Sequence, residues 1–280
     1  MLDCSTGYSN FDLISMKKIK IHPMKISSLT GSNRSFIYFF LIIFGLLYIN
    51  TTITMTQPTF EKDIIKTSAG NLEITFLGHG SLMLSFNGKI IHVDPFSSVA
   101  DYTFLPKADL ILITHEHGDH LDLRALSMIR KENTEIICTE KCAPSLSGSI
   151  IMKNGDIRSS GKIAIEAVPA YNIINGPNAN QVFHPKGQGN GYILTTGDKR
   201  IYIAGDTENT PEMKALKGID IAFLPMNLPY TMTPEMVADA VRAFKPKILY
   251  PYHYGDTDTQ KLLDLLKNDK STEVLIRKMK

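Results

Sequence analysis

The residues best suited to chemistry in this sequence gather in one short segment, Thr114 to His120, which reads Thr-His-Glu-His-Gly-Asp-His. Neutral imidazoles and a carboxylate are ligands that suit zinc and related metals. If a strand leads into the segment, His115 and His117 project from one face, because side chains alternate along a strand. Gly118 then lets the chain turn, so that the two residues after it reach a second point nearby. The spacing therefore predicts a metal site.

Further candidate ligands stand at the ends of other apolar runs, namely His184, Asp206 and His253. They are needed because one loop supplies at most four ligands, too few for two metal ions. Asp206 follows Gly205 in Ala-Gly-Asp-Thr, and glycine permits close approach of the backbone. Since a carboxylate can bridge two cations, Asp206 is the natural bridging ligand. The ends of buried strands are also where α/β proteins place function.

The elements that must position these residues are short apolar runs separated by turn residues. The runs predict strands at 72–77, 81–86, 89–93, 109–114, 135–138, 162–168, 191–196, 200–204, 219–224 and 247–250. Asn87-Gly88 predicts a tight hairpin. Helices are expected at 121–131, 233–244 and 261–267, the second with a threonine cap and Pro234 at its first position. Two facing sheets with helices outside, an αββα sandwich, accommodate this mixture.

The N-terminal part of the chain has a different composition. Residues 1–35 carry a net charge of +3 and precede fourteen apolar residues at 36–49. Fourteen is the length of a signal-peptide core, and an uncleaved anchor over 36–55 is the alternative. We expect a basic leader at 1–35, with 1–15 as a candidate over-called start, a linker at 56–70 and the catalytic domain at 71–280. The basic flank predicts export or membrane anchoring with that domain outside the cytoplasm; a cytoplasmic protein is the alternative.

Composition excludes several other classes of protein. Hydrophobic residues make up 43% and charged residues 21%, which excludes wholesale disorder. The net charge of +2 leaves a body near neutrality after the basic leader, so we expect no nucleic-acid partner. Three cysteines are too few for a disulfide scaffold.

Taken in order, the segments Thr-His-Glu-His-Gly-Asp-His, Ala-Gly-Asp-Thr and Tyr-His-Tyr-Gly resemble the metallo-β-lactamase-fold hydrolase superfamily from residue 71 onward. Phe-Leu-Gly-His-Gly-Ser at 76–81 and His-Val-Asp-Pro-Phe at 92–96 resemble its branch of ascorbate-6-phosphate lactonase-like and N-acyl-phosphatidylethanolamine phospholipase D-like proteins. The resemblance implies a four-layer αββα sandwich, of α/β or α+β class, with two metal ions. The ligands it implies are His115, His117 and His184 for the first metal, Asp119, His120 and His253 for the second, and Asp206 as the bridge.

In one respect the sequence departs from this superfamily. Many members carry a histidine directly after a strand like 163–170, where this chain has Pro-Ala-Tyr-Asn at 169–172. We assign the role to His184, fourteen residues further on; a surface histidine is the alternative.

Other residues have two interpretations each. Asp94 is either an acceptor that orients a ligating imidazole or a plain turn residue. His79 either faces the metals and binds substrate or is structural, and His92, inside an apolar strand, is structural. Asn227 and Tyr230 form a pocket wall or merely pack a loop.

The resulting hypothesis is hydrolysis of an ester, lactone or phosphodiester by hydroxide bound to two divalent metals. Asp119 orients the nucleophile as well as binding metal. Zn²⁺ is expected, with Mn²⁺ or Fe²⁺ as alternatives, and the substrate is a small or lipid-like molecule. Two alternatives are a di-iron redox protein and a non-catalytic metal-binding module. His117 favours the hydrolase, because the redox proteins resembling this fold have glutamate there.

Overall fold

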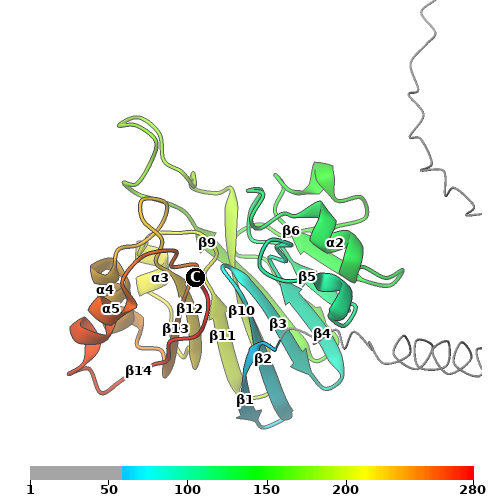
Figure 1. Ribbon diagram of the computed structural model, residues 1–280, viewed down its shortest axis with the longest axis horizontal. Coiled ribbons are helices and arrows are strands. Elements are labelled where there is room, and N and C mark those ends of the chain that lie inside the picture. The colour runs from blue at the N-terminus through cyan, green and yellow to red at the C-terminus, as the bar shows by residue number, and fades with distance from the viewer. Residues whose placement is uncertain (1–58) are drawn as a thin grey trace, which may run out of the picture. The chain divides into compact units, whose positions relative to one another are not determined.

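The computed structural model describes residues 59–280, which form two seven-stranded sheets (Figure 1). The first sheet contains β1 (Glu61–Thr67), β2 (Gly70–Gly78), β3 (Ser81–Phe86), β4 (Lys89–Val93), β5 (Leu110–Leu112), β6 (Glu135–Cys138) and β7 (Ile150–Ile151). The second contains β8 (Ile157–Ser160), β9 (Ile163–Ala170), β10 (Gly189–Thr196), β11 (Lys199–Ile203), β12 (Ile221–Pro225), β13 (Ile248–Tyr252) and β14 (Glu273–Val274). In each sheet the strands lie in chain order, from one edge to the other.

Both sheets have the same pattern of strand directions. The first four strands of each sheet pair antiparallel, and the last three continue in parallel from the fourth. Parallel neighbours need crossover connections, which place helices on the sheet faces. The helices are α2 (Leu123–Ile129), α3 (Pro211–Lys214), α4 (Pro234–Phe244) and α5 (Thr259–Leu266), with 3-10 turns η1 (Tyr102–Phe104) and η2 (Ala143–Ser145).

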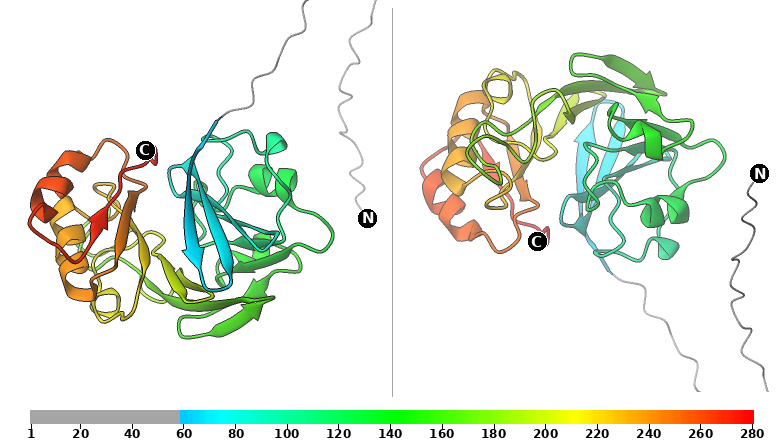
Figure 2. Two further views of the ribbon diagram at one scale, coloured as in Figure 1. Left: turned by 90° about the horizontal axis from the view of Figure 1, so that it is seen from below. Right: turned by 90° about the horizontal axis from the view of Figure 1, so that it is seen from above.

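The two sheets face each other, with helices on their outer sides (Figure 2). Between the sheets lies one buried cluster, to which the first sheet contributes residues such as Leu84 and Leu110 and the second Phe223 and Tyr250. A second cluster lies between the second sheet and α3, α4 and α5, and a third contains residues of α2. The predicted αββα sandwich is confirmed.

Local signals define α4, the longest helix of residues 59–280, as the sequence predicts. The hydroxyl of Thr233 accepts from the backbone N–H of Met236, and Pro234 occupies the first turn. Such a cap stabilises a helix by about 1 kcal/mol. Lys245 ends the helix in the left-handed conformation, with φ of 51°. The chain then returns as β13, whose carboxyl end leads directly to His253.

One boundary differs from the prediction. The chain over 56–70 is expected to be a linker, but Glu61–Thr67 pairs along its whole length with β2. The sequence does not reveal this strand because β1 is an edge strand whose side chains are exposed or half-buried; that of Ile64, for example, is 62% exposed. The expected strands also omit β7 and β14, which have only two residues each, and β8, which is exposed along most of its length.

The leader at 1–35, the apolar segment at 36–49 and the whole of the alternative 36–55 anchor lie outside the described residues. Within residues 59–280, no helix is long and apolar enough to cross a membrane.

Candidate metal centre

The candidate ligands come from loops that follow strands of both sheets. The loop after β5 carries His115, His117, Asp119 and His120, and the β2–β3 turn carries His79. The second sheet supplies the others: His184 between β9 and β10, Asp206 after β11 and His253 after β13. Seven positions that the sequence predicts as ligands therefore converge at one place, together with His79. That they bind metal remains a prediction.

The first group consists of His115, His117 and His184, whose ring nitrogens all lie within 4.8 Å of one another. Nε2 of His115 lies 3.1 Å from Nδ1 of His117. His115 and His184 are buried, whereas His117 is exposed. This group matches the set implied for the first metal and supports the assignment of His184 over a surface role.

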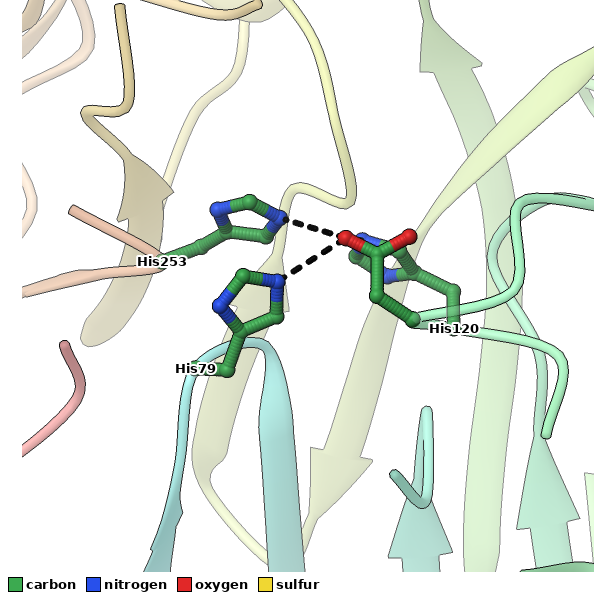
Figure 3. Close-up of side chains that lie close together, drawn as sticks. His79, His120 and His253 are labelled. Atoms are coloured by element: carbon green, nitrogen blue, oxygen red, sulfur yellow. Dashed lines mark hydrogen bonds and ion pairs between the residues drawn. The ribbon is translucent and has the colours of Figure 1, made fainter. Parts of the chain in front are cut away.

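The second group consists of Asp119, His120 and His253, with His79 added (Figure 3). Oδ2 of Asp119 lies 2.9 Å from Nε2 of His79, 3.5 Å from Nε2 of His253 and 3.7 Å from Nε2 of His120. The rings of His79 and His253 lie with centroids 3.7 Å apart. His79 thus points toward the ligand positions, as the functional interpretation expects.

Asp206 lies between the two groups. Its Oδ2 is 3.4 Å from Nε2 of His184 and 3.5 Å from Nε2 of His253, and its Oδ1 is 3.5 Å from Nε2 of His120. Ligands bound at 2.0–2.1 Å to one tetrahedral ion are about 3.3–3.4 Å apart. The separations are thus long for hydrogen bonds but match ligands that share an ion.

Unpaired polar atoms support the same conclusion. Among the described residues, four buried atoms of this centre have no hydrogen-bond partner: Nε2 of His120, His184 and His253, and Oδ1 of Asp206. A buried polar atom without a partner costs about 1–3 kcal/mol. Four such atoms directed at the same volume are accounted for if cations bind there, so the donor set fits a metal centre.

Behind the ligands, hydrogen bonds fix the ring orientations. Asp94 is fully buried and accepts from the backbone N–H of Thr114 (2.8 Å), its hydroxyl (2.6 Å) and Nδ1 of His120 (2.8 Å). The Thr114 hydroxyl in turn accepts from Nδ1 of His115 (3.0 Å). Asp94 therefore supports one histidine of each group through its Nδ1 side, so that both Nε2 atoms face the other candidate ligands.

Sequence reasoning missed Asn172. Its Oδ1 accepts from Nδ1 of His184 (3.0 Å), and its Nδ2 donates to the carbonyl of Tyr230 (2.7 Å). This is the place where many members have a histidine, so the departure in sequence leads to a supporting amide. The only available signal was the missing histidine itself. Asn227, considered as a pocket wall, has its amide 3.4 Å from Nδ1 of His253.

The backbone is strained at the centre. His79, Asp94 and His253 have φ values of 53°, 43° and 46°. Non-glycine residues in this region cost about 1–3 kcal/mol each and cluster at functional sites. Gly205 has φ of +65°, and a Cβ there would lie 3.0 Å from Cβ of Thr114. The close approach expected before Asp206 is thus present.

Electrostatics favour the ligating forms of most side chains. Burial lowers the pKa of His115 well below its usual value and the pKa of His184 to about 4. At His120 burial also acts downward, but Asp206 and Asp94 outweigh it and raise the pKa to about 9. Burial acts to raise the pKa of Asp119 and Asp206, yet the surrounding histidines hold both well below the usual range. Metal ligands must be deprotonated, and both carboxylates are.

His92 has a structural environment, as predicted. It is fully buried, and its Nε2 donates to the carbonyl of Pro106 (3.0 Å). Burial lowers its pKa to about 4, so the ring is neutral at pH 7. It belongs to none of the three metal-capable groups found among residues 59–280.

Comparison with known proteins identifies the family. The family model described as the beta-lactamase superfamily domain matches residues 73–253. A UPF0173 metal-dependent hydrolase from Archaeoglobus fulgidus is 31% identical over 195 residues, covering 66% of this chain and 84% of the relative. A relative of the same description from Thermus thermophilus is 32% identical over 195 residues, with the same two coverages.

A solved structure extends the similarity. The crystal structure of a protein described as a metal-dependent hydrolase from Parabacteroides distasonis has 54% sequence identity to this chain and a TM-score of 0.76. The match covers 79% of this chain and all of that one. The chain therefore belongs to the metallo-β-lactamase superfamily. More narrowly, it is a metal-dependent hydrolase. Its assignment to the lactonase-like and phospholipase-like branch remains a prediction.

Proposed function

We propose that the protein hydrolyses an ester, lactone or phosphodiester with two divalent metal ions, most favourably Zn²⁺. The observation that carries the proposal is a set of four buried polar atoms that have no hydrogen-bond partner within residues 59–280: Nε2 of His120, His184 and His253, and Oδ1 of Asp206. Five imidazoles and two carboxylates form the proposed ligand set, and imidazole with carboxylate suits zinc. Bound there, a metal pair supplies an activated water and polarises the bond to be cleaved.

The side chains of this protein have distinct roles in the proposal. His115, His117 and His184 would hold one ion, Asp119, His120 and His253 would hold the other, and Asp206 would be the ligand shared by both. Asp119 also accepts a hydrogen bond from the attacking nucleophile. Nε2 of His79, 2.9 Å from Oδ2 of Asp119, holds that carboxylate in place and would contact a substrate bound at the centre. Asp94 keeps His115 and His120 oriented through Thr114.

We also propose that residues 36–49 direct the catalytic domain to the outside of the cytoplasm, as a cleaved signal or a retained anchor. The support is the run of fourteen apolar residues behind a basic flank. The mass of the mature N-terminus tests this, since an intact chain in the soluble fraction contradicts it.

Elemental analysis combined with a substrate screen tests the hydrolase. The screen contains p-nitrophenyl esters, a lactone and bis-p-nitrophenyl phosphate. We expect two metal ions per chain, and a His117→Ala variant with native fold, less metal and no hydrolysis. Glu116→Ala, a change in the same loop outside the metal-capable groups, is the matched control and should keep its metal. Full activity in a rigorously metal-free preparation would overturn the proposal.

A further inference from the structure

Two loops beside the candidate metal centre expose apolar side chains. Ile173 and Ile174 are 49% and 72% exposed on the loop between β9 and β10, and Leu228 and Tyr230 are 46% and 47% exposed on the loop after β12. Phe183 returns toward β10, its ring 5.0 Å from that of Tyr230. We call these five residues the apolar lip. The segment between β9 and β10 extends beyond the ends of the sheets (Figure 1).

The lip is continuous with the metal centre. Phe183 lines the same cavity as His115, His117 and His184. Asn172, which supports His184, immediately precedes Ile173. Asn227, whose amide lies beside His253, immediately precedes Leu228. Each loop therefore passes directly from the support of a candidate ligand into exposed apolar residues.

Hydrogen bonds hold the two loops together. The amide Nδ2 atoms of Asn172 and Asn175 donate to the carbonyls of Tyr230 and Thr231, both at 2.7 Å. The buried carboxylate of Glu208 accepts from the backbone N–H groups of three consecutive residues, 173–175, at 2.6–3.0 Å. Since these contacts fix the backbone on both sides, the lip is largely preformed, and binding there needs little reordering.

The composition of the loops defines what they can bind. Residues 172–184 and 226–233 contain no Asp, Glu, Lys or Arg. The one such residue in the rest of the β9–β10 loop is Lys186, whose Nζ is paired with Glu212 at 2.7 Å. The stretches that carry the lip therefore offer apolar surface and no charged side chain of the Asp, Glu, Lys or Arg type. Ligand sites typically combine such surface with a few polar groups that fix orientation. Here the polar groups are the metal centre and its supporting amides.

We propose that the apolar lip binds an uncharged apolar group of the substrate, such as an acyl chain, while the bond to be cleaved lies at the histidine cluster. The inference rests on the proposed hydrolase function. Burial of one methylene contributes about 0.8 kcal/mol, close to fourfold in binding when burial is complete. With the half-exposed surface of the lip, we expect about twofold for each methylene that contacts it.

Chain-length dependence tests the proposal. With p-nitrophenyl esters, we expect kcat/KM of the zinc-loaded protein to rise at least about tenfold from acetate to octanoate. In the double variant Ile174→Ser/Leu228→Ser, the two values should lie within about twofold of each other. The matched control is Ile157→Ser on β8, a residue 74% exposed and outside both loops, which should keep the wild-type ratio. A wild-type ratio near one overturns the proposal.

A binding experiment separates failure of the lip from failure of the hydrolase. If no ester is cleaved, calorimetric titration with octanoate and acetate replaces turnover. Tighter binding of octanoate that is lost in the double variant supports the lip even though the ester chemistry is wrong. Equal binding of the two acids overturns it. It is also overturned if the double variant changes only the sedimentation of the protein, or only its binding to phosphatidylcholine vesicles, since the lip then contacts another copy or a membrane.

Discussion

The two halves of the sandwich put an aspartate after equivalent strands and use it in opposite ways. β4 and β11 are each the last antiparallel strand of a sheet and pair in parallel with the next strand. Asp94 follows β4, and its carboxylate accepts three hydrogen bonds, two from Thr114 and one from His120. Asp206 follows β11, and its Oδ1 has no hydrogen-bond partner among the described residues. The same residue type thus supports ligands in one half and remains available to bind in the other.

The strand register explains the difference. Asp94 donates its N–H to the carbonyl of Leu112, and the equivalent bond in the second sheet is made by Ala204 to Phe223. Asp206 therefore stands two residues further along, beyond the left-handed Gly205. That extension removes the carboxylate from the backbone donors at the strand end and places it among the histidines. Position in the register, more than residue type, decides which aspartate can bind a cation.

The largest expected effect comes from Asp206→Ala. If Asp206 bridges two ions, the variant should lose bound metal and at least about 10³-fold in kcat/KM, because both ions lose a ligand. The free energy of unfolding of the metal-free protein should fall by no more than about 1 kcal/mol, since losing the contacts with His120, His184 and His253 at 3.4–3.5 Å is offset by no longer burying a carboxylate. Metal analysis and denaturant unfolding measure the two quantities. If the Asp206→Ala variant keeps the metal content of the wild type, Asp206 is not a ligand and the proposed difference between Asp206 and Asp94 is wrong.

In contrast to Asp206→Ala, the variant Asp94→Ala should lose more stability and less metal binding. The change leaves the N–H and hydroxyl of Thr114 and Nδ1 of His120 without their acceptor, so we expect the metal-free protein to lose about 3 kcal/mol of stability. Metal affinity should fall about 10–100-fold, as it does when a supporting residue is removed. Denaturant unfolding and competition with a chelator measure both. A loss of less than 1 kcal/mol would mean that Asp94 is no more structural than Asp206.

Much of the site followed from the sequence because strand ends converge. The apolar runs before Thr114, Asp206 and His253 predicted strands, and the ends of neighbouring strands lie close together. The prediction of the fold failed where that signal was weak. β1 and β8 are largely exposed, with Ile64 and Ile157 exposed to 62% and 74%, so no buried face marks these strands in the sequence.

Contacts between loops had no sequence signal at all. The sequence could propose that Asp94 orients an imidazole, but not that it serves His115 through Thr114 as well as His120. Likewise, Asn172 and His184 are twelve residues apart on an irregular loop, and only the folded chain shows that they pair. His79 could not be placed either, because a turn between two glycines has no fixed direction.

Within the two strands, the comparison continues at His92 and Tyr202. His92 on β4 pairs with β5 as Tyr202 on β11 pairs with β12, and each has one buried polar atom without a partner among the described residues. A histidine in an unfolded chain titrates near neutral pH and a tyrosine does not, so the two halves should differ in their response to acid.

We therefore expect His92 to make stability depend on pH. Its pKa is about 4 in the folded protein and 6.5 in the unfolded chain, so between these values the unfolded chain binds a proton that the folded protein excludes. The neutral His92 stabilises the folded protein fully above pH 6.5, and this stabilisation is lost as the pH falls toward 4. At pH 5 the loss amounts to about 2 kcal/mol of the free energy of unfolding. His92→Gln should remove this difference in the metal-free protein. The prediction is contradicted if the free energies of unfolding of wild type and variant, measured with denaturant, fall by the same amount from pH 7 to pH 5.

The smallest effect should come from Tyr202→Phe, and its sign is the informative part. The Tyr202 hydroxyl is buried and unpaired among residues 59–280, so removing it should raise the free energy of unfolding by up to about 1 kcal/mol. Tyr192→Phe on the neighbouring β10 is the matched control, because that hydroxyl donates to the carbonyl of Ile113 (2.8 Å). The control should lose about 1 kcal/mol. Equal losses of stability in both variants would show that the Tyr202 hydroxyl has a hydrogen-bond partner in solution. His92 would then be the one of the two equivalent positions whose buried polar atom lacks a partner among the described residues.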